Sequence, residues 1–205
     1  MKFKRIFYLY FLFFSLPVLA DDCLPYKFTP RVDLTIPGWS KEVVQPLKEM
    51  DLFHGNVIAT MVDNYDIIAD ITNIEDGYCV ALKAVDANVG YSNFLVQIDI
   101  RHVPESCSYN AVLAHEDEHI RTYLSVIDDY KKELQDSIYS AADSIMPIFV
   151  RNAEDIDDAV NELNAELQAH PDLILIKQKI KAAEEIRNKR IDQMDTGQNL
   201  KKCFE

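Results

Sequence analysis

The pattern of apolar residues changes once along the chain, near Pro104, and this change limits the folds open to it. From Asn56 to Val103, short runs rich in β-branched residues alternate with Asp, Asn and Gly, which is typical of strands and tight turns. After Pro104, apolar residues recur at spacings of three, four and seven, which is typical of helices. Strands followed by helices predict an α+β fold, β-rich over residues 21–104 and helical over 105–205.

The β-rich part is expected to form an antiparallel meander. From Val96 onward apolar and polar residues alternate, which predicts one face on a core and one face in water. Three prolines in residues 21–40 indicate an extended lead-in with one short strand at 32–36. Residues 40–50 could form a short helix, interrupted by Pro46. The four strands expected in the meander are 57–62, 65–74, 78–89 and 94–103.

The helical part is expected to contain one long helix and a C-terminal helical hairpin. Ser106 or Ser108 can cap the long helix, which should run from about Ser108 to about Ile145 and end near Pro147. The hairpin helices are expected at residues 152–169 and 171–194, with Pro171 in the first turn of the second.

The long helix carries the motif HExxH, from His115 to His119. Residues four apart on a helix differ by only about 40° of rotation, so both imidazoles can reach one metal ion. Glu116 lies beside them, where it could act on a metal-bound water. The two histidines interrupt the apolar stripe between Val112 and Tyr123. Residues within such a stripe are half-buried, which suits metal ligands better than surface residues without a role. The motif therefore predicts a Zn²⁺ site with His115 and His119 as ligands and Glu116 as the catalytic base.

The same five residues also fit the inverted motif HxxEH, in which Glu118 would be the base. The ligands are the same in both readings. The preceding strands favour Glu116. A further alternative is that His115 and His119 have no functional role and simply lie among acidic residues on a solvated helix face.

A catalytic zinc usually takes a third protein ligand, and no further histidine follows His119 at a familiar spacing. Glu154 with Asp158 has the Glu-x-x-x-Asp spacing of a ligand and its hydrogen-bonded partner, so Glu154 is the predicted third ligand. Alternatives are Asp128, Asp129, Glu133, Glu162 and His170, and His54 and His102 could serve as ligands or transition-state donors. Tyr109, Tyr123 and Tyr130 could stabilise an oxyanion.

Cys79, Cys107 and the segment Val112 to His119 resemble the bacterial zincin-like peptidases of the DUF922 type. The similarity covers roughly residues 55–135, and only the HExxH core is specific. The resemblance implies an exported zincin-like fold, zinc on His115 and His119, and Glu116 as the catalytic base. It implies nothing for the helices beyond Pro147.

Residues 1–20 read as a secretory signal peptide, with a basic start, an apolar run and small residues at Val18 and Ala20. We expect the remaining residues, 21–205, to form one domain without a membrane span, periplasmic or secreted. Loss of Lys2, Lys4 and Arg5 changes the formal charge from −13 to −16, which argues against nucleic-acid binding.

Four cysteines in an exported chain predict two disulfides, and four cysteines allow three connectivities. The favoured pairing is Cys79 with Cys107, which would join a strand to the motif helix. Cys23 would then pair with Cys203 and join the chain ends.

The sequence thus favours a zinc-dependent metallopeptidase acting on a peptide or protein substrate. One alternative is a non-catalytic metal- or partner-binding protein on a zincin-like scaffold. The other is a helical interaction protein, because residues 152–194 carry apolar stripes among alternating charges.

Overall fold

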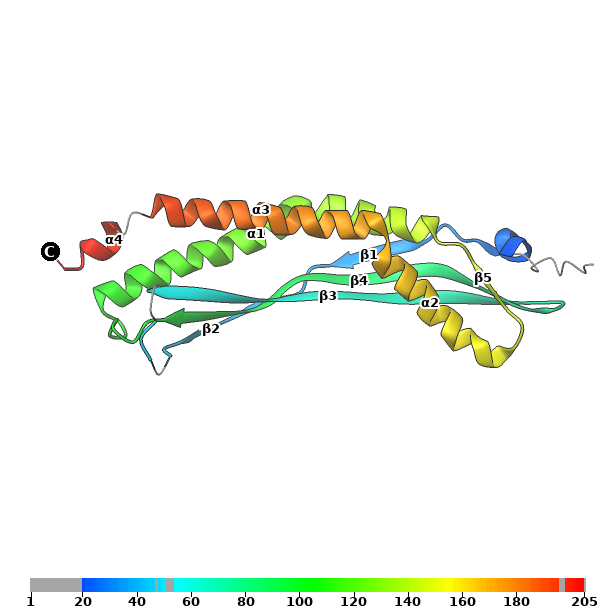
Figure 1. Ribbon diagram of the computed structural model, residues 1–205, viewed down its shortest axis with the longest axis horizontal. Coiled ribbons are helices and arrows are strands. Elements are labelled where there is room, and N and C mark those ends of the chain that lie inside the picture. Colours follow the sequence, from blue (N-terminus) through cyan, green and yellow to red (C-terminus); the bar gives the residue numbers. More distant parts are fainter. Residues whose placement is uncertain (1–19, 47, 51–53, 196–197, 205) are drawn as a thin grey trace, which may run out of the picture.

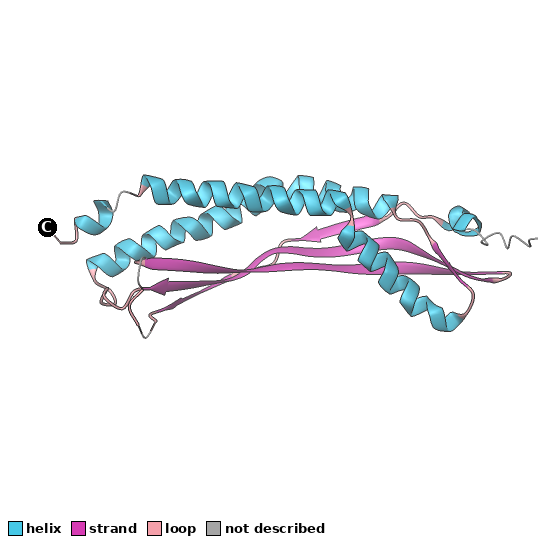
Figure 2. Cartoon of the chain, viewed as in Figure 1, coloured by secondary structure: helices cyan, strands magenta, loops and turns pink. Residues whose placement is uncertain are grey.

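The computed structural model describes residues 20–46, 48–50, 54–195 and 198–204. Nearly all of the predicted signal peptide lies outside this range. The described part is an α+β structure in which helices cover one face of a sheet (Figures 1 and 2). Its strands are β1 (Arg31–Thr35), β2 (Ser40–Val44), β3 (Gly55–Ile74), β4 (Gly77–Ile98) and β5 (Ile148–Val150). Its helices are η1 (Ala20–Tyr26), α1 (Cys107–Ser144), η2 (Ala153–Asp155), α2 (Ile156–Ala169), α3 (Pro171–Met194) and α4 (Gln198–Lys201).

The long strand β4 is the centre of the sheet. β3 pairs with it in antiparallel register along nearly its whole length. Three short strands pair with the opposite side of β4, in the order β5, β1 and β2 along its length. β1 and β2 run parallel to β4, and β5 runs antiparallel to it. At a rise of about 3.3 Å per residue, β3 and β4 form a hairpin roughly 70 Å long. The sheet is therefore narrow and elongated (Figure 1).

The expected four-strand meander is wrong, because β3 and β4 each replace two of its strands. Of the predicted breaks, only the turn at residues 75–76 reverses the chain. Asn64 stays in the ladder opposite Asn88, and the exposed sheet face accommodates such polar residues. Gly90 also stays in β4, with a φ of +151°, and a methyl group there would lie 2.9 Å from Cδ of Pro37.

The predicted short helix at residues 40–50 is also wrong, because Ser40–Val44 forms β2. Its backbone pairs with Asn93–Gln97 of β4, and Lys41 binds Asp117 of α1 at 2.8 Å. The predicted strand at 32–36 is confirmed as β1.

The long predicted helix is confirmed as α1, and Ser106 is its cap, accepting a hydrogen bond from the Tyr109 amide at 3.2 Å. The last predicted helix is confirmed as α3. α2 starts at Ile156, later than expected, after the short turn η2. No helix in the described part of the chain combines the length and hydropathy needed to cross a bilayer.

The core lies between the sheet and the helices, and both the β-rich and the helical parts contribute to it. Ile138 of α1 is fully buried in this core. Replacement of Ile138 by alanine should lower the free energy of unfolding by about 2–5 kcal/mol, because it removes buried methylene groups and leaves a cavity. Urea denaturation measures the loss. Ile186→Ala is the control, since this side chain is 70% exposed and should change stability by less than about 0.5 kcal/mol. Equal losses in the two variants would contradict the packing.

All four cysteines form disulfides, but the expected pairing is wrong: Cys23 bonds to Cys79, and Cys107 bonds to Cys203. Cys79 lies near the start of β4 and Cys107 follows its end, so about 60 Å of strand separates them. The two ends of the described chain also lie at opposite ends of the molecule (Figure 1). One disulfide therefore fixes η1 to the sheet, and the other fixes the C-terminal segment to the start of α1.

Candidate metal centre

The candidate centre lies where α1 and α3 present polar side chains to each other. The helices run antiparallel: Arg187 of α3 pairs with Asp129 of α1, and Lys179, earlier on α3, pairs with Glu133, later on α1. Nearer the start of α1, the histidine pair therefore meets the last turns of α3. Three atoms converge there, from His115, His119 and Asp192.

The distances among these atoms are short. Nε2 of His115 and Nε2 of His119 are 3.1 Å apart. Oδ1 of Asp192 lies 3.1 Å from Nε2 of His119 and 3.5 Å from Nε2 of His115. The two histidines are half-buried, whereas the Asp192 side chain is 61% exposed at the rim. These three side chains could hold a metal ion.

The partners of the opposite ring nitrogens indicate the tautomer of both histidines. Nδ1 of His115 lies 2.8 Å from a carboxylate oxygen of Asp195, and Nδ1 of His119 lies 2.9 Å from Oδ1 of Asn188. Both oxygens are acceptors, so each Nδ1 carries a proton and donates it. In the neutral rings both Nε2 atoms then present lone pairs, facing each other and the Asp192 oxygen. Three lone-pair donors brought together in this way are an arrangement suited to a cation.

Glu116 of the same helix is buried, and its carboxylate lies against Gly55 at the start of β3. A methyl group at Gly55 would overlap its carboxylate oxygen and come within 2.7 Å of Cγ1 of Val112, so a larger residue there would displace the Glu116 carboxylate. Burial is the largest cause that raises the pKa of Glu116, to about 7, with His119 opposing and Asp192 adding to the rise. A carboxyl group poised near neutrality suits a general base.

Glu116 and the three converging side chains share one cavity of about 530 Å³. Its walls come from the first residues of β3, the first half of α1, the end of α3 and α4. The lining side chains that matter here are His54, His115, Glu116, His119, Tyr123 and Asp192.

The structure separates the two glutamates of the motif. Glu118 does not line the cavity: its side chain is 57% exposed and binds Arg121 at 2.6 Å. Tyr123 lines the cavity, one turn beyond His119, whereas Tyr109 and Tyr130 are not among the lining residues.

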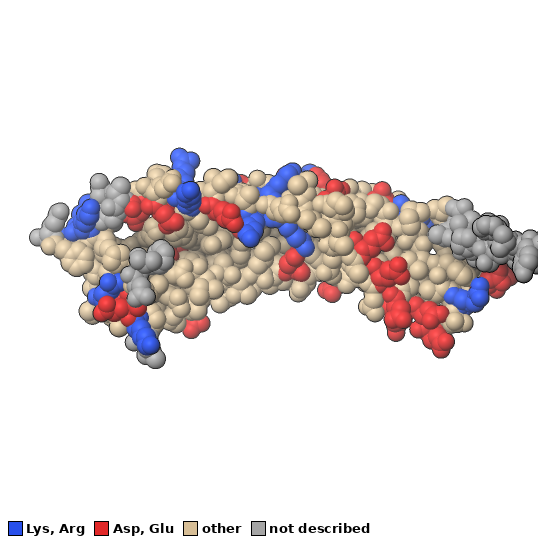
Figure 3. Space-filling model, in the orientation of Figure 1, with Lys and Arg blue, Asp and Glu red and all other residues tan. Residues whose placement is uncertain are grey.

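Glu154, the predicted third ligand, is not part of the group of three. It lies in η2, which immediately precedes α2 in the chain. The acidic side chains of this region form an exposed surface over α2 (Figure 3). Among the predicted alternatives, Asp129 and Glu133 bind basic residues of α3, and His170 caps α3 by accepting a hydrogen bond from the Asp172 amide.

The residues that sequence reasoning missed are Asn188, Asp192 and Asp195 of the α3 end. A signal for Asn188 and Asp192 exists in the spacing of α3: one stripe along it is apolar and buried at first and then continues at intervals of four with polar residues, of which Asp192 is exposed. The stripe is Leu173, Ile176, Ile180, Glu184, Asn188 and Asp192.

Comparisons of the chain with protein-family models, with curated proteins and with solved structures find no match. The resemblance to DUF922-type zincins therefore stays a prediction, and functional inference depends on the geometry of the site.

Proposed function

We propose that the chain is an exported zinc-dependent metallopeptidase with His115, His119 and Asp192 as zinc ligands and Glu116 as the base. The spacing of the three ligand atoms carries the proposal. Tetrahedral zinc with bonds of about 2.0–2.1 Å places neighbouring ligand atoms roughly 3.3 Å apart. The observed separations of 3.1, 3.1 and 3.5 Å bracket that value.

The hydrogen-bond partners of the two histidines also support zinc binding. Zinc-binding histidines typically donate their other N–H to a carboxylate or carbonyl oxygen, which fixes the tautomer and ring orientation. Asp195 and Asn188 serve His115 and His119 in this way. Three protein ligands leave a fourth position for water, as in catalytic rather than structural zinc sites.

The proposed mechanism assigns separate tasks to the side chains. Zinc, when bound, lowers the pKa of a coordinated water to near 7 and polarises a carbonyl group. Glu116 accepts the proton of the attacking water and passes it to the leaving amine. Burial of Glu116 keeps its carboxylate away from bulk water, and the missing side chain of Gly55 leaves room for that carboxylate at the cavity wall.

A peptide substrate is favoured by the backbone of β3 beside the cavity. The Asp99 amide donates to the His54 carbonyl at 2.9 Å, so the backbone groups of His54 point toward β4. The direction of the backbone N–H and C=O groups alternates along a strand. The groups of Gly55 and Val57 therefore point to the outer edge of the sheet. Among the described residues β3 pairs with β4 alone. An extended peptide can therefore pair with Gly55 and Val57, both of which line the cavity.

The two disulfides fit an extracellular or periplasmic protein, since such bonds persist in oxidising compartments. A peptidase in that location would act on exported or foreign polypeptides. This location is part of the proposal.

Zinc content and chelator-sensitive cleavage test the proposal. The mature protein should bind about one zinc ion per chain and cleave members of a random peptide library. Phenanthroline should stop cleavage, and added zinc should restore it. Zinc binding without any cleavage would instead favour the non-catalytic metal-binding alternative. A protein that binds no zinc would contradict both.

A further inference from the structure

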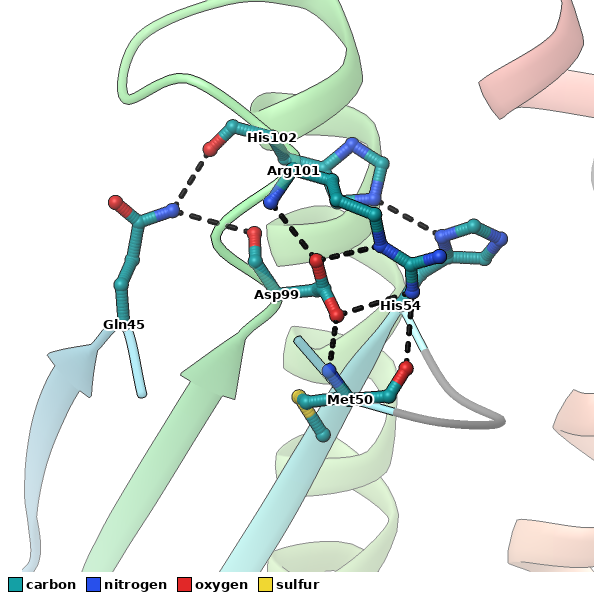
Figure 4. A network of polar contacts seen from close by, with 6 residues as sticks. All are labelled: Gln45, Met50, His54, Asp99, Arg101 and His102. Atoms are coloured by element: carbon teal, nitrogen blue, oxygen red, sulfur yellow. Dashed lines mark hydrogen bonds and ion pairs between the residues drawn. The ribbon is translucent and has the colours of Figure 1, made fainter. Parts of the chain in front are cut away.

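His54 occupies a position from which it can act on a bound substrate. It immediately precedes β3, next to Gly55, whose Cα lies against Glu116. It lines the same cavity as His115, His119 and Glu116. In Figure 4 one ring nitrogen of His54 points to His102 and the other points away from it. His54 has no task in catalysis by zinc and Glu116 alone.

His102 is the partner that selects the tautomer of His54. Its side chain is 4% exposed, and its Nε2 lies 3.0 Å from Nδ1 of His54. Only one proton can lie between these two nitrogens. The other nitrogen of His102, Nδ1, is buried and has no hydrogen-bond partner among the described residues.

The location of that proton follows from the cost of burial. A buried N–H without an acceptor is less tolerable than a buried lone pair without a donor. Nδ1 of His102 is therefore the unprotonated nitrogen of the ring, and Nε2 of His102 carries the proton. Burial lowers the pKa of His102, and the nearby His54 adds to this effect, so the ring stays neutral. Nε2–H of His102 then donates to Nδ1 of His54, and His54 keeps its own proton on Nε2.

The loop that carries His102 is fixed by several hydrogen bonds (Figure 4). Gln45 donates from Nε2 to the His102 carbonyl at 2.7 Å. The buried Asp99 carboxylate accepts from the side chain and amide of Arg101 and from the Met50 amide. The Arg101 side chain is the main cause that holds the pKa of Asp99 well below its usual range. These bonds fix the backbone that carries His102, and burial confines its ring beside His54.

We propose that His54 is a further catalytic residue, which donates a hydrogen bond from Nε2 to the oxyanion that forms on the substrate carbonyl, and that His102 is its positioning residue. This inference rests on the proposed peptidase function. A neutral imidazole is suited to the task because it offers one N–H donor in a fixed direction while its other nitrogen is already held.

The tautomer of His54 can be measured without any substrate. Proton–nitrogen correlation spectra of the zinc-loaded mature protein near neutral pH should show His54 protonated on Nε2 and bare on Nδ1. The spectrum of His54→Phe identifies the signals. In His102→Leu, Nδ1 of His54 loses its donor, and the Nδ1–H form should appear. A wild-type ring protonated on Nδ1 would overturn the assignment.

Cleavage kinetics test the catalytic role, with the library peptide that the wild type cleaves fastest as substrate. His54→Phe should lower kcat about 10²-fold with zinc content unchanged. His54→Gln should recover part of that loss through its amide donor, and His102→Leu should lower kcat about tenfold. His170→Gln is the matched histidine control, because His170 caps α3 outside the cavity, and it should cleave like the wild type.

The outcomes separate the two proposals. A wild type that cleaves peptides alongside an equally active His54→Phe would overturn the role of His54 and leave the peptidase proposal standing. A zinc-loaded wild type that cleaves nothing would overturn the peptidase proposal, and the role of His54 in catalysis would fall with it.

Discussion

Replacement of Asp192 by alanine should lower zinc affinity at least 10²-fold. Its Oδ1 atom is the third of the converging ligand atoms and the one that comes from a different helix. Loss of a residue that merely orients a ligand typically costs 10–100-fold in metal affinity, so loss of a direct ligand should cost more. Competition with a chromophoric chelator measures the change. The side chain is 61% exposed, so the metal-free variant should melt close to the metal-free wild type.

Glu154→Ala is the matched control for that variant. Glu154 is an exposed acid of η2, so its removal changes the net charge equally and should leave zinc affinity unchanged. The pair of variants also decides between the ligand expected from sequence spacing and the one found by geometry. Normal zinc affinity in Asp192→Ala, with a loss in Glu154→Ala, would contradict the proposed centre.

The contrast between these two acids shows what the sequence could and could not predict. His115 and His119 were predictable because helical geometry alone places residues four apart on one face. The position of Asp192 depends on how α3 packs against α1, and no local spacing expresses that packing. The Glu-x-x-x-Asp spacing at Glu154 was weak evidence, because an acidic helix produces it without any function.

The errors in the β-rich part have a related cause. Asp63, Asn64 and Gly90 signal turns in a sequence, yet in this chain they lie within β3 and β4. A strand with one face in water accepts polar residues such as Asp63 and Asn64, so turn residues and exposed strand residues are not separable by type. Gly90 is instead buried, where Pro37 packs closely against it. The wrong disulfide pairing followed directly, since four short strands would bring Cys79 near Cys107 and two long ones keep them apart.

The boundaries of α1 and α3 were predictable for the opposite reason. Each helix has a long apolar stripe and a clear stop or start signal, such as Pro147 after α1 and Pro171 at the start of α3. Long periodic segments average over many residues, so a few polar interruptions do not hide the period. In both helices those interruptions are the residues that form the candidate centre.

Glu116→Gln should abolish most peptide cleavage while the protein keeps its zinc. Loss of a general base typically lowers the rate 10²–10⁴-fold, and glutamine has nearly the same shape but cannot accept the proton of the attacking water. Because Glu116 is not one of the three converging ligands, zinc stoichiometry should match that of the wild type. Cleavage rates of a library peptide and zinc content, measured on the same preparation, test both statements.

Glu118→Gln is the control, and it also tests the inverted reading of the motif. Glu118 points to solvent and pairs with Arg121, so the variant should lose at most an exposed ion pair, worth about 0–1 kcal/mol of stability, and should cleave normally. Loss of cleavage in Glu118→Gln with retention in Glu116→Gln would make Glu118 the base. The burial of Glu116 beside Gly55, in the cavity that both histidines line, is the reason to expect the opposite.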